Sequence, residues 1–340
     1  MPTPYFDLSK VPESEFDRAL ELIFARPEDY DVHAQVLYYK DLGLKVIRDP
    51  TTSRLRRYAR VALEERKPLS AIRVSDGELG VLTFGAFDDT PNLDRFIAVD
   101  SLLKQSDSFV LDDTWLLVIR DLLLGAIAQA DVVGVPGFWL EDGPTRAFRR
   151  SPEKMRASFR EWPRGVYGDW KGRIHMPELA RQGYLDGKVV GSNYFYLAFL
   201  SGLDELVSLA SSVFLMTAHP NLEEAFRRRY PDTPLRSLRI GRRDDPRRRK
   251  SRTPYFLAEY HDALPRDLTG ALCLVGGGPW SLIYCSWIRQ RGGVALDIGS
   301  GADLLAGEIT RSVHRRIGDD AHKYSLVDDT TEGTPEPSPA

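Results

Sequence analysis

The sequence predicts an α/β protein with a Rossmann-like, mostly parallel sheet flanked by helices and preceded by an N-terminal helical lead-in. Short apolar runs alternate with helical stretches over most of the chain, as expected for parallel strands joined by helical crossovers. The composition, with 42% hydrophobic and 28% charged residues, is that of an ordinary folded protein. A chain of 340 residues is long enough for one large domain or two small ones.

The first 67 residues are predicted to form a helical extension. Apolar side chains recur at helical spacing from Glu13 onward, as in Phe16 and Leu20, and the pattern continues to about Arg66. Pro68 then marks a change from helical to strand-like patterning. We therefore place the start of the main domain at this proline.

The main domain is predicted to span residues 68–318, and residues 319–340 form a tail. The strands of the domain are predicted where short apolar runs end in turn residues. They cover residues 69–74, 131–135, 212–218, 271–275 and 294–298. The tail is rich in Asp, Thr, Glu, Pro and Ser, so we expect it to be disordered.

Charge, cysteine content and the length of apolar runs exclude several classes of protein. A formal net charge of -3 argues against a protein that coats nucleic acid. Cys273 and Cys285 are too few for a disulfide scaffold and lack zinc-ligand spacing, so we expect buried thiols in a reducing compartment. The first ten residues do not resemble a signal peptide, and no apolar run is long enough to span a membrane. We expect a cytoplasmic protein, and the sequence does not define its oligomeric state.

A basic segment from Arg236 to Arg252 is rich in arginine. One interpretation is a solvated loop. The alternative is an electrostatic funnel for a phosphate-bearing donor or an anionic acceptor, including a lipid-linked acceptor at an anionic membrane surface. Nucleic acid is the weakest of these partners, because no aromatic side chains interleave with the arginines to stack on bases.

The main candidate site is the turn Asp76, Gly77, Glu78, which follows the predicted strand at residues 69–74. Ligands bind at this end of the strands in open α/β sheets, and glycine lets the backbone turn tightly between the two carboxylates. Two hard oxygen ligands in a short turn suit Mg²⁺ or Mn²⁺ with phosphate oxygens, and Arg73 could add a bidentate phosphate contact. The alternative is structural, since Asp-Gly turns are common and Glu78 could stabilise the start of a following helix.

A second candidate is the glycine-rich turn Gly276, Gly277, Gly278, Pro279, which leads from the predicted strand at residues 271–275 into a helix. Free backbone N–H groups at such a helix start bind anions, and proline fits the first helical turn. The turn matches neither the Walker pattern nor the dinucleotide-binding glycine pattern. Tight packing of strand against helix is the alternative explanation.

The third candidate is Asp297, at the end of the last predicted strand. Residues 296–301 alone look like the first motif of a methyltransferase that uses S-adenosylmethionine. That motif resembles the start of its fold and should be followed by several strand and helix units, whereas few structured residues are expected after Gly301. A terminal strand that carries Asp297 into the site fits better, with Asp297 acting behind the metal ligands, as a hydroxyl ligand or as a base.

Among the histidines, only His219 stands at the end of a predicted strand. We interpret it as a structural turn residue, and a catalytic base is the alternative. No Gly-x-Ser-x-Gly elbow occurs, and neither cysteine has the local signature of a nucleophile, which disfavours covalent hydrolase chemistry.

Three motifs in this order resemble the bacterial GT-D fold glycosyltransferases. They are the strand and turn from Ile72 to Glu78, the pair Gly278 and Pro279, and the segment from Leu296 to Gly299. The family pattern is a strand ending in Arg-x-Gly-Asp-Gly-Glu, then a Gly-Pro turn between strand and helix, then a final strand ending in Asp-Ile-Gly. The match covers about residues 68–318.

The resemblance implies a hexosyltransferase that uses a nucleotide-sugar donor, a UDP-sugar, with Mn²⁺ or Mg²⁺ held by Asp76 and Glu78 as an Asp-x-Glu motif. The acceptor implied is a glycan, a glycoprotein or a lipid-linked acceptor. Ser75 departs from the family, which usually has glycine there, and could narrow the pocket or add a hydroxyl ligand. The expected catalytic residues are Asp76, Glu78 and Asp297, and the expected donor-binding residues are Arg73, Ser75, Gly77, Gly276, Gly277, Gly278, Pro279 and Gly299.

Two other classes of function stay open. One is a methyltransferase built on residues 296–301, and the other is a non-catalytic anion-binding protein on a degenerate enzyme fold. Binding of UDP with a metal, or of S-adenosylmethionine, separates the glycosyltransferase from the methyltransferase.

Overall fold

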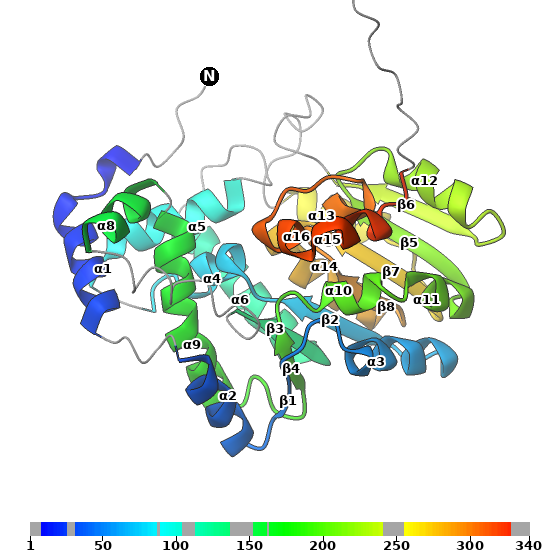
Figure 1. Ribbon diagram of the computed structural model, residues 1–340, viewed down its shortest axis with the longest axis horizontal. Coiled ribbons are helices and arrows are strands. Elements are labelled where there is room, and N and C mark those ends of the chain that lie inside the picture. Colours follow the sequence, from blue (N-terminus) through cyan, green and yellow to red (C-terminus); the bar gives the residue numbers. More distant parts are fainter. Residues whose placement is uncertain are drawn as a thin grey trace, which may run out of the picture.

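The computed structural model has one sheet in its described residues, and every strand pairing is parallel (Figure 1). The described residues are 8–25, 31–86, 89–103, 113–136, 152–161, 163–240 and 255–327. The strands are β1 (Lys45–Ile47), β2 (Leu69–Arg73), β3 (Val132–Val135), β4 (Val189–Ser192), β5 (Ser212–Thr217), β6 (Leu235–Arg239), β7 (Ala271–Gly276) and β8 (Val294–Asp297). Their order across the sheet is β1-β4-β3-β2-β8-β7-β5-β6. The predicted fold class is therefore confirmed.

All five predicted strands are present, and three further strands were missed. The predicted strands β2, β3, β5, β7 and β8 are almost entirely buried, so their sequences are nearly continuous apolar runs. The edge strands β1 and β6 are short or partly exposed. Strand β6 contains two arginines among its five residues, and it was missed because it overlaps the segment interpreted as a basic loop. Strand β4 has four residues, one of them Gly191. The rest of the basic segment, from residue 241, lies outside the described residues.

Helices surround the sheet and connect its strands. The α-helices are α1 (Glu13–Ala25), α2 (Val32–Asp41), α3 (Ser53–Glu64), α4 (Asp76–Leu82), α5 (Pro91–Leu103), α6 (Asp113–Gln129), α8 (Pro152–Glu161), α9 (Asp169–Arg181), α10 (Tyr196–Leu200), α11 (Leu203–Leu209), α12 (Leu222–Arg229), α13 (Tyr255–Ala263), α14 (Ser281–Gln290), α15 (Gly301–Leu305) and α16 (Ser312–Ile317). Shorter turns of helix are η1 (Leu8–Lys10), η3 (Arg164–Gly168), η5 (Gly278–Trp280) and η6 (Gly318–Tyr324). In the described part of the chain, no helix combines the length and the apolar character needed to cross a bilayer.

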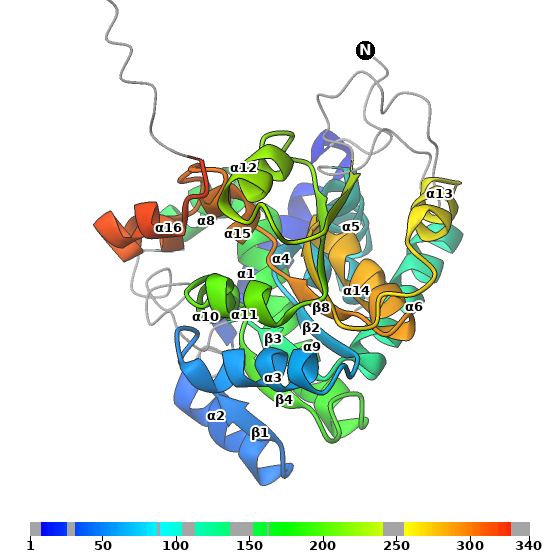
Figure 2. The ribbon, with the colours of Figure 1, turned by 90° about the vertical axis from the view of Figure 1, so that its right-hand side faces the viewer.

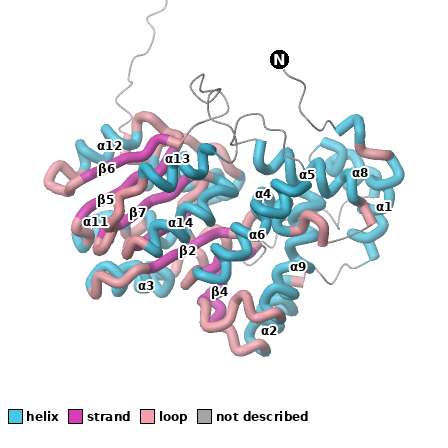
Figure 3. The backbone as a smooth tube through the Cα atoms, turned by 180° about the vertical axis from the view of Figure 1, so that it is seen from behind, coloured by secondary structure: helices cyan, strands magenta, loops and turns pink. Residues whose placement is uncertain are grey.

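The two faces of the sheet bury two separate cores, because successive side chains of a strand point to opposite faces. In β2, for example, Ile72 packs with α4, α6 and α14, whereas Ala71 packs with α3, α10 and α11. Figure 2 shows the same division, with α10 and α11 on one side of the strands and α14 and α6 on the other. A smaller third core joins α1, α5 and α8, which lie beside the strands in Figures 1 and 3.

At the carboxyl end of β8, the connections that follow neighbouring strands leave toward opposite faces of the sheet. The helix that follows β8, α15, packs in the core on one face. The helices that follow its two neighbours, α4 after β2 and α14 after β7, pack in the core on the other face. Open α/β sheets bind ligands at neighbouring strand ends whose connections leave toward opposite faces of the sheet. The fold therefore singles out the ends of β2, β8 and β7.

Two of the sequence expectations about the chain ends need correction. The first 67 residues are not purely helical, because β1 pairs with β4 and so extends the main sheet. Residues 319–327 of the tail are not free of the core: Ala321 in η6 is buried, and Leu326 donates its N–H to the carbonyl oxygen of Leu305 at 2.9 Å. These residues were missed because single apolar side chains within a polar segment carry no periodic signal. Residues 328–340 lie outside the described residues.

We predict that Gly172→Ala in α9 destabilises the protein although alanine favours helices. A Cβ at Gly172 would lie 2.1 Å from Cδ1 of the fully buried Leu79, and Leu79 belongs to the helix that carries the candidate site. Overpacking of this kind costs about 1–3 kcal/mol, whereas the gain in helix propensity is about 1 kcal/mol.

The matched control is Gly125→Ala in α6, because its added Cβ would meet no atom of the described residues within 4 Å apart from its chain neighbours and its own helix backbone. This variant should raise the free energy of unfolding by about 0.5–1 kcal/mol. Urea unfolding of both variants checks the packing of α9 on α4. Equal stabilisation by both substitutions would show that the packing is wrong.

Candidate functional site

A buried ion pair joins the ends of β2 and β8. Arg73 is the last residue of β2 and is 7% exposed, and Asp297 is the last residue of β8 and has no exposed surface. The Nε atom of Arg73 lies 3.4 Å from Oδ1 of Asp297, and the backbone N–H of Arg73 donates to Oδ2 at 3.1 Å. Charges buried this deeply stay paired because losing one partner leaves the other uncompensated.

The guanidinium of Arg73 is almost fully enclosed by neighbouring residues. Its Nη1 donates to the backbone oxygen of Asn193 at 3.3 Å, and its Cζ lies 5.2 Å from the centroid of the Tyr196 ring. A Cβ at Gly299 would lie 1.5 Å from Nη2, and Gly299 has φ +42, so both space and backbone conformation require glycine here. The pair with Asp297 and these contacts hold the guanidinium in one place. The phosphate contact of Arg73 stays a prediction.

The turn after β2 begins helix α4 with a capping box. Oε2 of Glu78 accepts the N–H of Ser75 at 2.8 Å, which is the typical exchange between the residue before a helix and its third residue. Glu78 is 3% exposed, whereas Asp76 is partly exposed. One carboxyl oxygen of Glu78 therefore stabilises the start of α4, as the structural alternative predicts. The role of Asp76 and Glu78 as metal ligands stays a prediction.

Burial and like charge shift the pKa values of the carboxyl groups in this cluster. Burial, assisted by the charge of Asp297, raises the pKa of Glu78 from 4.5 to about 7. Burial also raises the pKa of Asp297, although the Arg73 guanidinium opposes this effect. With Asp76, the cluster contains three carboxyl groups and one guanidinium. An excess of buried carboxyl groups favours a bound cation or a bound proton.

The glycine-rich turn packs directly against the start of α4. A Cβ at Gly77 would lie 3.2 Å from Cγ of Pro279, so the two predicted motifs are neighbours. Gly278 has φ +55, which explains a glycine at that position. The N–H of Gly277 donates to Oγ of Ser281 at 2.8 Å and so is used within the turn. Close packing, which was the alternative explanation for this motif, accounts for these contacts.

Two residues that follow β4 belong to the site but were missed in the sequence. Nδ2 of Asn193 donates to Oγ of Ser75 at 3.3 Å. Oδ1 of Asn193 is buried without a hydrogen-bond partner in the described residues, and the residue is 8% exposed. The hydroxyl of Tyr196, whose ring faces Arg73, lies 3.2 Å from Nε2 of the buried His314. Both were missed because β4 itself was not predicted. The available signal was the polar and aromatic run that follows a short valine pair.

His219 lies at the same edge of the sheet, two residues after β5. It is 8% exposed, and its Nε2 lies 2.8 Å from Oδ1 of Asp303 in α15. Its backbone N–H donates to Oγ1 of Thr217 at 3.2 Å, as expected of a turn residue. The partnership with Asp303 adds a second polar cluster next to the glycine turn, since a Cβ at Gly276 would contact both Thr217 and Ala302.

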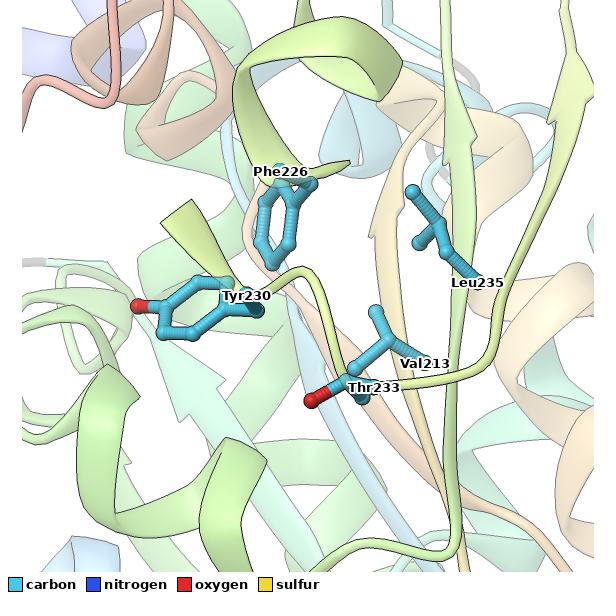
Figure 4. A pocket seen from close by; sticks show the side chains of 5 residues that line it. All are labelled: Val213, Phe226, Tyr230, Thr233 and Leu235. Atoms are coloured by element: carbon cyan, nitrogen blue, oxygen red, sulfur yellow. The ribbon is translucent and has the colours of Figure 1, made fainter. Parts of the chain in front are cut away.

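A small apolar pocket between α12 and the strands β5 and β6 lies away from this edge (Figure 4). It is lined by Val213, Phe226, Tyr230, Thr233 and Leu235. Val213 and Leu235 belong to the amino-terminal halves of β5 and β6, opposite the end that carries His219. The pocket contains none of the candidate residues and is part of the packing of α12.

Comparison with protein-family models, with curated proteins and with solved structures finds no match for this chain. The chemistry of the site therefore has to be inferred from its own residues and their contacts.

We predict that Glu78→Gln flattens the dependence of stability on pH. Between pH 4.5 and about 7 the folded protein keeps a proton on Glu78 that the unfolded chain has lost. The free energy of unfolding therefore falls as pH rises through this window and levels off above it. Glutamine retains the capping acceptor and has no proton to lose, so the fall should be smaller by on the order of 2 kcal/mol.

Urea unfolding at several pH values between the two limits measures this slope. The exposed Glu224→Gln in α12 is the control and should keep the wild-type slope. An unchanged slope in Glu78→Gln would mean that Glu78 is ionised throughout.

We also predict that Gly299→Ala destabilises the protein more than Gly187→Ala. Both glycines have positive φ, but in the described residues only the Cβ at Gly299 meets another atom, the Arg73 guanidinium. Displacing the guanidinium weakens its pair with Asp297, so the difference in unfolding free energy should be at least about 2 kcal/mol. If urea unfolding shows that both variants lose the same free energy of unfolding, backbone strain alone is the cause. The enclosure of Arg73 then contributes nothing to stability.

Proposed function

We propose that this chain is a metal-dependent glycosyltransferase that moves a sugar from a UDP-sugar to a glycan, glycoprotein or lipid-linked acceptor. The observation that carries the proposal is the pair of buried carboxyl groups, Glu78 and Asp297, beside the buried Arg73, with Asp76 acting on Glu78. This cluster lies where β2 and β8 send their helices to opposite faces. The order of the sequence motifs supports the proposal. Open α/β sheets bind nucleotides at strand ends of this kind.

The residues present fit a hard divalent cation. Asp76 and Glu78 would hold Mn²⁺ or Mg²⁺, which prefer carboxylate oxygens and fill their other positions with water and phosphate oxygens. Two observations agree with this donor set: the excess of carboxyl groups, and the buried Oδ1 of Asn193, which has no hydrogen-bond partner in the described residues. Such a cation supplies charge neutralisation for the departing diphosphate.

The other residues of the site have two proposed roles: some hold neighbouring residues in position, and others contact the ligand. Asp297 has no exposed surface, so of the roles open to it, supporting the residues around it fits and direct contact with the donor does not. Arg73 holds Asp297, and Pro279 packs against Gly77 and so supports the start of α4. Asp76 and Ser75 are the partly exposed residues of this turn and would contact the diphosphate side of the bound metal, with Glu78 as the buried metal ligand. Ser75 already accepts from Asn193, which places its hydroxyl beside that amide.

The two alternative functions are less well supported. No strand follows β8 in the described residues, whereas a methyltransferase motif at residues 296–301 should begin the cofactor fold. Asp297 is also occupied by Arg73 and fully buried, so it is not available to a cofactor hydroxyl. A non-catalytic anion-binding protein would use the same strand ends, and turnover separates it from an enzyme.

We predict that UDP with Mn²⁺ raises the melting temperature of the full chain by a few degrees and that S-adenosylmethionine does not. A ligand at 100 times its dissociation constant stabilises the folded state by about 2.7 kcal/mol. The shift should disappear with a chelator and in Asp76→Asn, and it should persist in Asp232→Asn, a matched change at an exposed residue of the turn before β6.

Turnover is then measured as UDP released from a panel of UDP-sugars. Glu78→Gln should lose this activity while remaining folded. A UDP shift that survives both the chelator and Asp76→Asn would remove the metal from the proposal. A shift with S-adenosylmethionine alone would favour the methyltransferase.

A further inference from the structure

The polar cluster formed by His219, Asp303 and Glu308 lies outside the proposed donor site. One ligand atom from each of the three residues lies within 4.8 Å of the others. His219 comes from the turn after β5, Asp303 from α15, and Glu308 from the turn that follows α15. That turn brings Glu308 back, because its N–H donates to the backbone oxygen of Asp303 at 2.7 Å. Segments far apart in the sequence are thus joined at this point.

The imidazole of His219 faces a carboxylate at each nitrogen. Nε2 lies 2.8 Å from Oδ1 of Asp303, which is a hydrogen bond. The other oxygen of Asp303 accepts from Oγ1 of Thr310, so this carboxylate is fixed from two directions. Nδ1 lies 3.7 Å from Oε1 of Glu308. That separation is too long for a hydrogen bond between the two atoms.

A neutral imidazole has one N–H, so donation from Nε2 to Asp303 leaves a lone pair on Nδ1. The lone pair then points toward the Glu308 carboxylate, and two acceptors face each other. Metal bonds from imidazole nitrogen and carboxylate oxygen are about 2.0–2.2 Å, so atoms up to about 4.2 Å apart can reach one ion. The gap of 3.7 Å therefore fits a metal ion better than it fits a proton.

We propose that Nδ1 of His219 and the carboxylate of Glu308 bind a divalent transition metal of the zinc class, with Asp303 holding the imidazole through Nε2. A carboxylate behind a ligating histidine is the usual way in which proteins fix the ring and its tautomer. Imidazole nitrogen favours Zn²⁺ over Mg²⁺, whereas the donor site offers oxygen ligands only. Water or ligand oxygens fill the remaining positions. The metal ties the end of β5 to the turn after α15, beside Gly276.

The experiment titrates Zn²⁺ alone into the full chain after chelator treatment and desalting, and measures binding by calorimetry. The Asp76→Asn variant serves as the parent, so that a cation at the donor site does not contribute. This parent should bind Zn²⁺, and adding Asp303→Asn should weaken binding by about 10–100-fold. Adding Glu308→Gln should weaken it by at least about tenfold. Adding the exposed Glu224→Gln should change nothing.

Glu308 is about half exposed, with a side chain 46% accessible, so its variant should fold normally even where a His219 variant fails. A second readout is the ¹⁵N spectrum of the imidazole, in which Zn²⁺ should shift Nδ1 of His219 and not Nε2. Equal affinity in Glu308→Gln and its parent overturns the proposal. So does the absence of Zn²⁺ binding. Because no nucleotide is used, the result does not depend on the proposed glycosyltransferase activity.

Discussion

The buried pair between Arg73 and Asp297 is the interaction on which the candidate site depends. It links the adjacent strands β2 and β8, and its two residues are 224 positions apart in the sequence. Taking two charges out of water is costly, and here the cost is offset by the backbone N–H of Arg73 and by the backbone oxygen of Asn193. Removing either charged partner of such a pair costs about 3–5 kcal/mol. The ends of β2, β8 and β4 are therefore held in one arrangement.

This arrangement also positions Asp76 and Glu78, the proposed metal ligands, at the start of α4. Glu78 is held by the capping box, Gly77 rests against Pro279, and Asn193 contacts Ser75. These contacts fix the start of α4. A site that holds a metal and a diphosphate needs ligands whose positions are set before binding. The buried residues around Arg73 and Asp297 hold these ligands in position before binding.

The sequence predicts the central strands and the edge that carries the site, because buried parallel strands are continuous apolar runs and their ends are marked by polar residues. It therefore placed Arg73, Asp76 and Asp297 on one edge. It could not predict that Arg73 is enclosed, since this depends on Gly299 and Asn193, which are distant in the sequence. The strands β1, β4 and β6 are too short or too exposed for the same signal, and with β4 the contacts of Asn193 were lost.

The most direct test of the central claim is a crystal structure of the full chain with UDP and Mn²⁺, in which anomalous scattering locates the metal. The account predicts an anomalous peak bound by Asp76 and Glu78, with the diphosphate at the carboxyl end of β8 and the Arg73–Asp297 pair unbroken. A nucleotide bound elsewhere, or a metal peak at His219 and none at Asp76, would contradict the account.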